Sequence, residues 1–203
     1  HRGVNWSWAT LTWRGETRDM FAVRGVYARP VSLHATGGAT AAITAHSVWK
    51  WDDEEPIADE RVVIKGQPQK DGVRLIEIAI ALKARVKGLE FGGRLGAGYS
   101  GFNLRMAPAE AQQIVFHSDP AAASPRRCRG HYSAQFPGGK GRAGVTVIPD
   151  PGNPGYPHAW REYPNLNYFQ PLFPGDKLIP LSDNDALELK YTLRVHADPA
   201  QDP

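Results

Sequence analysis

The stretch that decides the fold is Leu-Glu-Leu-Lys-Tyr-Thr-Leu-Arg-Val-His at residues 187–196. Apolar residues occupy every second position of this stretch, and charged or polar residues lie between them. A period of two predicts a β-strand with one buried face and one solvated face. His196 falls on the polar face, so we interpret it as a surface histidine.

Other strands are predicted from similar but weaker patterns. Alternation recurs over residues 76–82, where isoleucine at every second position favours a strand. Further strands are predicted over residues 20–28, 41–51, 58–65, 102–106 and 144–148. One helical turn is expected over residues 108–113. Residues 149–180 are rich in proline, asparagine, glycine and aromatic residues, which predicts a long irregular loop that forms the wall of a ligand site.

The composition indicates one all-β domain. The 17 prolines and 21 glycines supply many turns between short apolar runs, and 41% of the residues are hydrophobic. Neither an internal repeat nor a change of composition marks a second domain. We therefore predict that residues 1–203 form a single antiparallel β-sandwich, with two sheets packed face to face.

Charge and cysteine content exclude several classes of partner and site. The formal net charge is only +3, and the one dense basic group is interpreted as a solvated loop rather than a nucleic-acid site. That group consists of Arg126, Arg127 and Arg129. No apolar stretch approaches the roughly 20 residues of a membrane helix, so no membrane partner is expected. Cys128 is the one cysteine, which excludes an intrachain disulfide and leaves the compartment undetermined.

Several motifs, taken in order along the chain, resemble a bacterial domain family of unknown function whose members often carry the label methane oxygenase PmoA. The matching pieces are His1-Arg2-Gly3, Glu60-Arg61, residues 99–105, residues 144–148 with Asn153, Pro157 and Trp160, and residues 189–196. The first motif of the family is a doubled histidine before Arg-Gly. The resemblance therefore implies a member that lacks its N-terminal strands. A membrane copper oxygenase needs spanning helices, which this sequence does not predict, so the methane label implies no chemistry here.

The family is similar in turn to sugar-processing β-sandwiches of the mutarotase-like kind, which tend to occur beside functions of carbohydrate catabolism. The resemblance thus implies a mutarotase-like supersandwich and a carbohydrate ligand. An uncovered sheet edge invites pairing with another chain. The implied truncation therefore predicts self-association, or pairing with the missing N-terminal segment.

The leading hypothesis is a carbohydrate-active enzyme that uses general acid/base proton transfer, with no cofactor and no metal. Such chemistry requires a group that titrates near neutral pH, and a cation or acid that holds the developing oxyanion. The candidate catalytic residues are His1, Arg2, His131, Tyr132 and His158. Aromatic faces pack against the C–H face of a sugar ring. The candidate binding residues are Trp6, Trp8, Asn153, Trp160 and Tyr168.

Three alternatives stay open. Glycoside hydrolysis needs paired carboxylates, and Glu60, at the start of a predicted strand, is a secondary candidate, whereas residues 52–55 read as a hydrated acidic turn. A non-catalytic carbohydrate-binding or structural domain needs only the tryptophans. If His1 is a mature terminus, its amine and imidazole together with a second histidine can chelate copper, as in polysaccharide monooxygenases.

Overall fold

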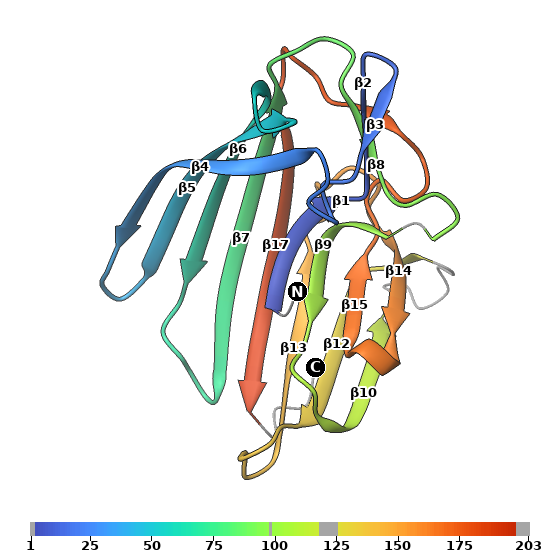
Figure 1. Cartoon of the computed structure of the whole chain (residues 1–203). Helices are drawn as coiled ribbons and strands as arrows, with labels where there is room; N and C mark the ends of the chain where they lie inside the picture. The colour runs from blue at the N-terminus through green and yellow to red at the C-terminus, as the bar shows by residue number, and fades with distance from the viewer. Residues whose placement is uncertain (1–2, 98, 118–125, 198–203) are drawn as a thin grey trace.

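The computed structural model describes residues 3–97, 99–117 and 126–197. This part of the chain forms three antiparallel sheets (Figure 1). The large sheet has eight strands in the order β10-β12-β13-β17-β7-β6-β5-β4. In that order the strands span Glu110–His117, Arg129–Gln135, Arg142–Pro149, Leu187–Ala197, Val73–Ala84, Glu55–Gly66, Ala41–Trp51 and Val26–Thr36.

Two smaller sheets accompany it. The small sheet has five strands in the order β1-β9-β15-β14-β11, which span Gly3–Trp8, Ser100–Arg105, Tyr168–Pro171, His158–Tyr163 and Arg126–Arg127. A four-stranded cap sheet has the order β16-β8-β2-β3, with strands at Ile179–Pro180, Glu90–Gly92, Thr10–Trp13 and Glu16–Arg18. A 3-10 turn, η1, spans Pro164–Leu166. No helix of the described residues has the length and apolar character needed to cross a membrane.

The large and small sheets pack face to face, and aromatic side chains fill the space between them. Phe102 of β9 stacks on Tyr191 of β17 with ring centroids 4.1 Å apart, and Trp8 of β1 meets Trp49 of β5 at 5.5 Å. Each of these rings is almost fully buried. The predicted all-β antiparallel sandwich is therefore confirmed.

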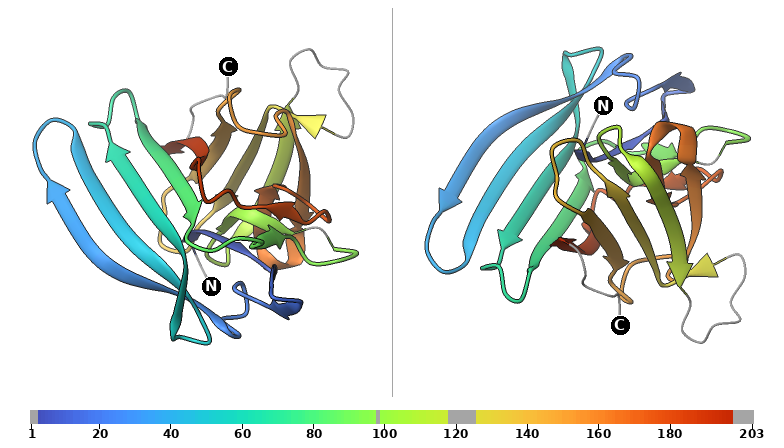
Figure 2. Two further views of the ribbon diagram at one scale, coloured as in Figure 1. Left: turned by 90° about the horizontal axis from the view of Figure 1, so that it is seen from above. Right: turned by 90° about the horizontal axis from the view of Figure 1, so that it is seen from below.

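The two sheets differ in width. Figures 1 and 2 show β4, β5 and β6 curving away from the small sheet, which lies against the other half of the large sheet. β1 forms one edge of the small sheet, and its register pairs Gly3 with Arg105 and Trp8 with Ser100 of β9. The sandwich is thus closed on one side and open beside β1.

The strongest strand predictions are confirmed. The alternating stretch at residues 187–196 lies in β17, the isoleucine run lies in β7, and residues 41–51 coincide with β5. Residues 58–65, 102–106 and 144–148 fall largely within β6, β9 and β13. The strand predicted over residues 20–28 begins only at Val26, because residues 19–25 form a turn closed by an Asp19 to Arg24 bridge.

Three sequence predictions are wrong. Residues 108–113 do not form a helical turn, because Glu110–His117 pairs as β10 with β12. Residues 149–180 are not one irregular loop, since β14, η1, β15 and β16 all lie within them. His196 is not a surface residue: it is 7% exposed and stacks on His131 at 5.2 Å. Gly144 lies opposite His196 and leaves room for the ring, since a Cβ there would lie 2.8 Å from Nε2.

Candidate functional site

Glu60 is a buried carboxylic acid in the middle of the large sheet. The pleat of β6 turns Glu60 toward the small sheet and its neighbours Asp59 and Arg61 toward the opposite face. Glu60 lies between Trp6 of β1 and Trp49 of β5, and only 6% of it is exposed. A carboxyl group therefore sits where the alternation of the strand would otherwise place an apolar side chain.

Two indoles hold the Glu60 carboxyl. Trp6 Nε1 donates to Glu60 Oε2 at 3.0 Å, and Trp49 Nε1 donates to the same oxygen at 3.2 Å. Burial raises the pKa of Glu60 above its usual 4.5, and the two indole hydrogen bonds oppose this rise. No charged side chain of the described residues contributes to the shift. The carboxyl thus keeps its proton to a higher pH than an exposed glutamate, as a general acid requires.

The neighbouring carboxyl of Asp59 shows the opposite behaviour. Arg85 donates to both Asp59 oxygens, at 2.8 Å from Nε and 2.7 Å from the terminal nitrogen, and His46 lies 3.0 Å away. The Arg85 hydrogen bonds hold the pKa of Asp59 below its usual value, with His46 adding to the effect. Two adjacent carboxyls on opposite faces of β6 therefore have opposite pKa shifts, which makes Asp59 a natural control for Glu60.

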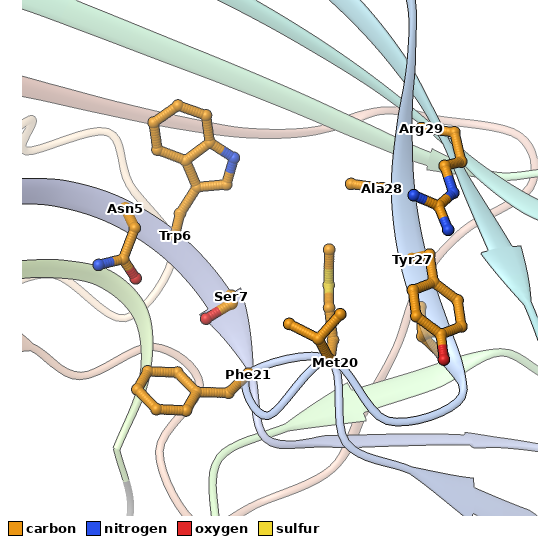
Figure 3. Close-up of a pocket in the computed structure, with 10 residues that line it drawn as sticks. Asn5, Trp6, Ser7, Met20, Phe21, Tyr27, Ala28 and Arg29 are labelled. Atoms are coloured by element: carbon orange, nitrogen blue, oxygen red, sulfur yellow. The ribbon is translucent and has the colours of Figure 1, made fainter. Parts of the chain in front are cut away.

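A cavity of about 270 Å³ lies between β1 and β4 (Figure 3). Trp6 forms one wall, and Tyr27, Ala28 and Arg29 form the wall opposite. In Figure 3 the indole nitrogen of Trp6 points toward the Ala28 side of this cavity. The Glu60 carboxyl, which accepts a hydrogen bond from that nitrogen, therefore lies next to the cavity wall.

The cavity lining combines apolar and polar side chains. Met20, Phe21, Val23 and Val26 contribute apolar surface, while Asn5, Ser7, Tyr27 and Arg29 bring hydrogen-bonding groups. Arg29 is held at the mouth by Asp53, with Nε 2.6 Å from Oδ1, and it lies 5.0 Å from the centre of the Tyr27 ring. Apolar walls with a few placed polar groups are typical of sites for small ring-shaped ligands.

The structure does not bring the predicted catalytic residues together. His1 and Arg2 lie outside the described residues. His131 and Tyr132 point to opposite faces of β12: His131 lies 3.0 Å from Thr146 Oγ1, whereas the Tyr132 hydroxyl donates to Asn167 Oδ1 at 2.9 Å between the sheets. His158 is buried at the start of β14, edge-on to Phe173.

The predicted binding residues are also dispersed, and only Trp6 lines the cavity. Trp8 is a core residue whose Nε1 donates to the Phe173 carbonyl at 3.0 Å. Trp160 stacks on Phe169 and donates to the Arg127 carbonyl. Asn153 bridges to the backbone of Lys190, and Tyr168 donates to Asn103 in the small sheet. The hydrogen bonds of Trp160, Asn153 and Tyr168 thus connect neighbouring parts of the fold.

Sequence reasoning found part of this site and missed the rest. The sequence singles out Glu60 as an acidic residue at the start of a predicted strand, and Trp6 as part of the tryptophan-rich start of the chain. Trp49 and the cavity residues of β4 were missed. One signal was present: Trp49 and Glu60 lie on neighbouring predicted strands, and an acidic residue inside an apolar strand pattern needs a buried donor.

Metal ligands do not gather in the described ranges. Among residues 3–97, 99–117 and 126–197, no group of three or more histidine, cysteine, aspartate or glutamate side chains is placed to hold a metal ion. The copper hypothesis depends on His1, which lies outside these ranges.

Comparison with known proteins places the chain in a family but assigns it no chemistry. No curated protein and no solved structure matches the sequence. One family model matches over residues 1–203, and its description is a family of unknown function (DUF6807). The chain therefore belongs to the family of unknown function DUF6807.

Proposed function

We propose that the chain is a carbohydrate-active protein in which Glu60 exchanges a proton with a sugar held against Trp6. The observation that supports this proposal is the burial of the Glu60 carboxyl between two indole N–H groups, which raises its pKa above the usual value. The Glu60 carboxyl is buried, is held by two indole N–H groups and has no cationic partner among the described residues, so it keeps its proton to a higher pH than an exposed glutamate does.

The cavity beside Trp6 suits one sugar ring. Its volume of about 270 Å³ lies just below the range of sites that hold drug-sized molecules, roughly 300–1,000 Å³. The indole of Trp6 offers an apolar face for the C–H side of a ring, and Asn5, Ser7 and Arg29 offer partners for hydroxyl groups. The carbohydrate ligand and the PmoA-like identity implied by the resemblance stay part of this proposal.

A single carboxyl favours some reactions over others. Glycosidases use two carboxyl groups about 5–10 Å apart. The pKa of Glu60 is set by burial and two indoles, with no contribution from a second carboxyl of the described residues. We therefore favour opening or isomerisation of one sugar ring, in which Glu60 donates a proton to the ring oxygen as the C–O bond breaks, while solvent water takes the proton of the anomeric hydroxyl as the carbonyl forms. The reverse transfer then restores the acid.

The test is proton transfer to sugars in deuterated water. Proton NMR follows both anomer interconversion and deuterium uptake at carbon for glucose, galactose, xylose and glucuronic acid. We expect the protein to accelerate one of these reactions, and Glu60→Gln to lower that rate at least about 100-fold. The amide oxygen of glutamine still accepts both indole hydrogen bonds, so the variant keeps its fold. Asp59→Asn removes a carboxyl from the opposite face and leaves the rate unchanged.

Two outcomes decide against catalysis by Glu60. Equal rates for the native protein and Glu60→Gln would contradict the proposal. If the native protein binds a sugar by isothermal titration but accelerates no reaction, the chain is a carbohydrate-binding domain, and Trp6→Ala then abolishes binding while Glu60→Gln retains it.

A further inference from the structure

The open half of the large sheet carries an apolar face that the described residues leave uncovered. This open face consists of Leu33, Ile43, Ala45, Ile64 and Ile76, which share the inner side of β4 to β7. Leu33 is 70% exposed and Ile43 is 41% exposed. Ile43 lies opposite Ile64 in the register, so these side chains form neighbouring contacts across the strands.

The other side of the same strands is largely polar. His34, Thr44, Arg61, Lys65 and Glu77 alternate with the residues of the open face. An antiparallel sheet that alternates in this way turns its apolar side to a covering layer. In the closed half the small sheet supplies that layer, for example where Phe102 covers Tyr191. The open face therefore has the residue pattern of a sheet face that a second layer covers.

The edge of the small sheet lies beside the open face. β1 is the terminal strand of that sheet, and β9 is its one partner strand among the described residues. An apolar cavity of about 290 Å³ separates β1 from β7, β13 and β17, and Val4, Ile76 and Val195 are among the residues that line it. Ile76 belongs both to this cavity and to the open face, so the two apolar regions adjoin.

The geometry of a β-sandwich indicates which kind of molecule fits beside β1 and over the open face. A strand that pairs with β1 lies about 4.8 Å from it, in the layer about 10 Å above the large sheet. Every second side chain of that strand then points to Ile43 and Ile64. Backbone groups of a strand satisfy the free edge of β1 while its side chains cover the open face. A lipid chain or a sugar can meet only one of these two requirements.

We propose that β1 and the open face form a docking site for an extended segment of another polypeptide, with an apolar residue at every second position. The segment adds a sixth strand to the small sheet, next to β1 and on the side of the cavity between β1 and β4, so the segment and a sugar in that cavity exclude each other. Backbone hydrogen bonds between the segment and β1 contribute to binding whatever the sequence of the segment. Its specificity comes from the side chains that meet Leu33, Ile43 and Ile64.

The experiment selects such a segment without assuming its sequence. A phage-displayed library of random twelve-residue peptides is selected on the immobilised protein, and an enriched peptide is synthesised with a fluorescein label. We expect enriched sequences to alternate apolar and polar residues. Fluorescence anisotropy measures the affinity, and hydrogen exchange measures protection of the β1 amides when the peptide binds.

Matched variants locate the site. Ile43→Asp on the open face is expected to weaken peptide binding at least tenfold, and Leu33→Asp to do the same. Thr44→Asp, on the opposite face of the same strand, is expected to bind within twofold of the native protein. Because Ile43 and Leu33 are substantially exposed, these variants fold, and a thermal melt verifies it.

Several results would overturn the proposal. Enriched peptides without alternation, unprotected β1 amides, or equal binding by Ile43→Asp and Thr44→Asp each contradict it. The open face is assigned to a second copy of the chain if the library yields no enriched peptide and light scattering shows a dimer that Ile43→Asp disrupts. Binding to phosphatidylcholine vesicles that is lost in Ile43→Asp, again with no selectable peptide, assigns it to lipid.

Discussion

The closed and open halves of the large sheet follow the same pattern of alternation but differ in what covers them. In the closed half, Phe102 and Tyr191 stack between two sheets and are shielded from water. In the open half, Leu33 and Ile43 point the same way and stay exposed. Glu60 lies at the border between the two halves. Alternation therefore tells which face of a strand is apolar, whereas the width of the opposing sheet decides whether that face is buried.

The largest expected difference between the halves concerns side-chain truncation. Phe102→Ala removes a fully buried ring stacked on Tyr191, and we expect it to lower the free energy of unfolding by about 3–5 kcal/mol. Ile43→Ala on the open face is expected to cost less than about 1 kcal/mol. Urea denaturation measures both values. Equal losses would show that the open face is buried in solution.

A smaller difference is expected from adding a methyl group. A Cβ at Gly144 in the closed half would lie 2.4 Å from the Tyr132 carbonyl oxygen, so Gly144→Ala should destabilise the protein by about 1–3 kcal/mol. A Cβ at Gly66 in the open half meets no atom within 4 Å. Gly66→Ala should therefore be neutral or slightly stabilising. Thermal melting of the two variants compares them, and a destabilised Gly66→Ala would contradict the account of the open half.

The smallest expected effect is a pH dependence at the border between the halves. Burial raises the pKa of Glu60, so its stabilising protonation is complete below about pH 4.5 and is lost as pH rises through the folded-state pKa. Arg85 lowers the pKa of Asp59 in the folded protein. The stability that the ionised Asp59 contributes is therefore fully present above the pKa of Asp59 in the unfolded chain, and it is lost as pH falls through the pKa of Asp59 in the folded protein.

Urea denaturation between pH 3 and pH 8 separates the two carboxyls. Relative to the native protein, Glu60→Gln should become more stable as pH rises. Asp59→Asn should become less stable over the same range. If both variants follow the same trend, the opposite environments of the two faces of β6 are not as described.

Local pattern predicted some elements because their geometry is local. Residues 41–51 and 187–196 alternate cleanly, and they form β5 and β17. β10 could not be predicted, because it exists through pairing with β12. The burial of His196 depends on Gly144, a residue far away in sequence on the neighbouring strand.

The candidate site also combines features that the sequence could predict with features that depend on the folded chain. Glu60 could be named as an acid at a strand, and Trp6 as an aromatic residue. Their hydrogen bond joins residues 54 positions apart, and only the folded chain places them together. His131 and His158 lie on different sheets for the same reason, since sequence alone does not tell which face of a strand meets which neighbour.

The most direct test of the central claim is an NMR titration of the Glu60 carboxyl carbon, assigned by its loss in Glu60→Gln. The account predicts a pKa of Glu60 above its usual 4.5, and a shift of that pKa when the protein is saturated with a sugar whose reaction it accelerates. The pKa of Asp59 is expected below its usual 3.8 and unchanged by the sugar. A Glu60 carboxyl that titrates like an exposed glutamate, with a midpoint that no sugar moves, would contradict it.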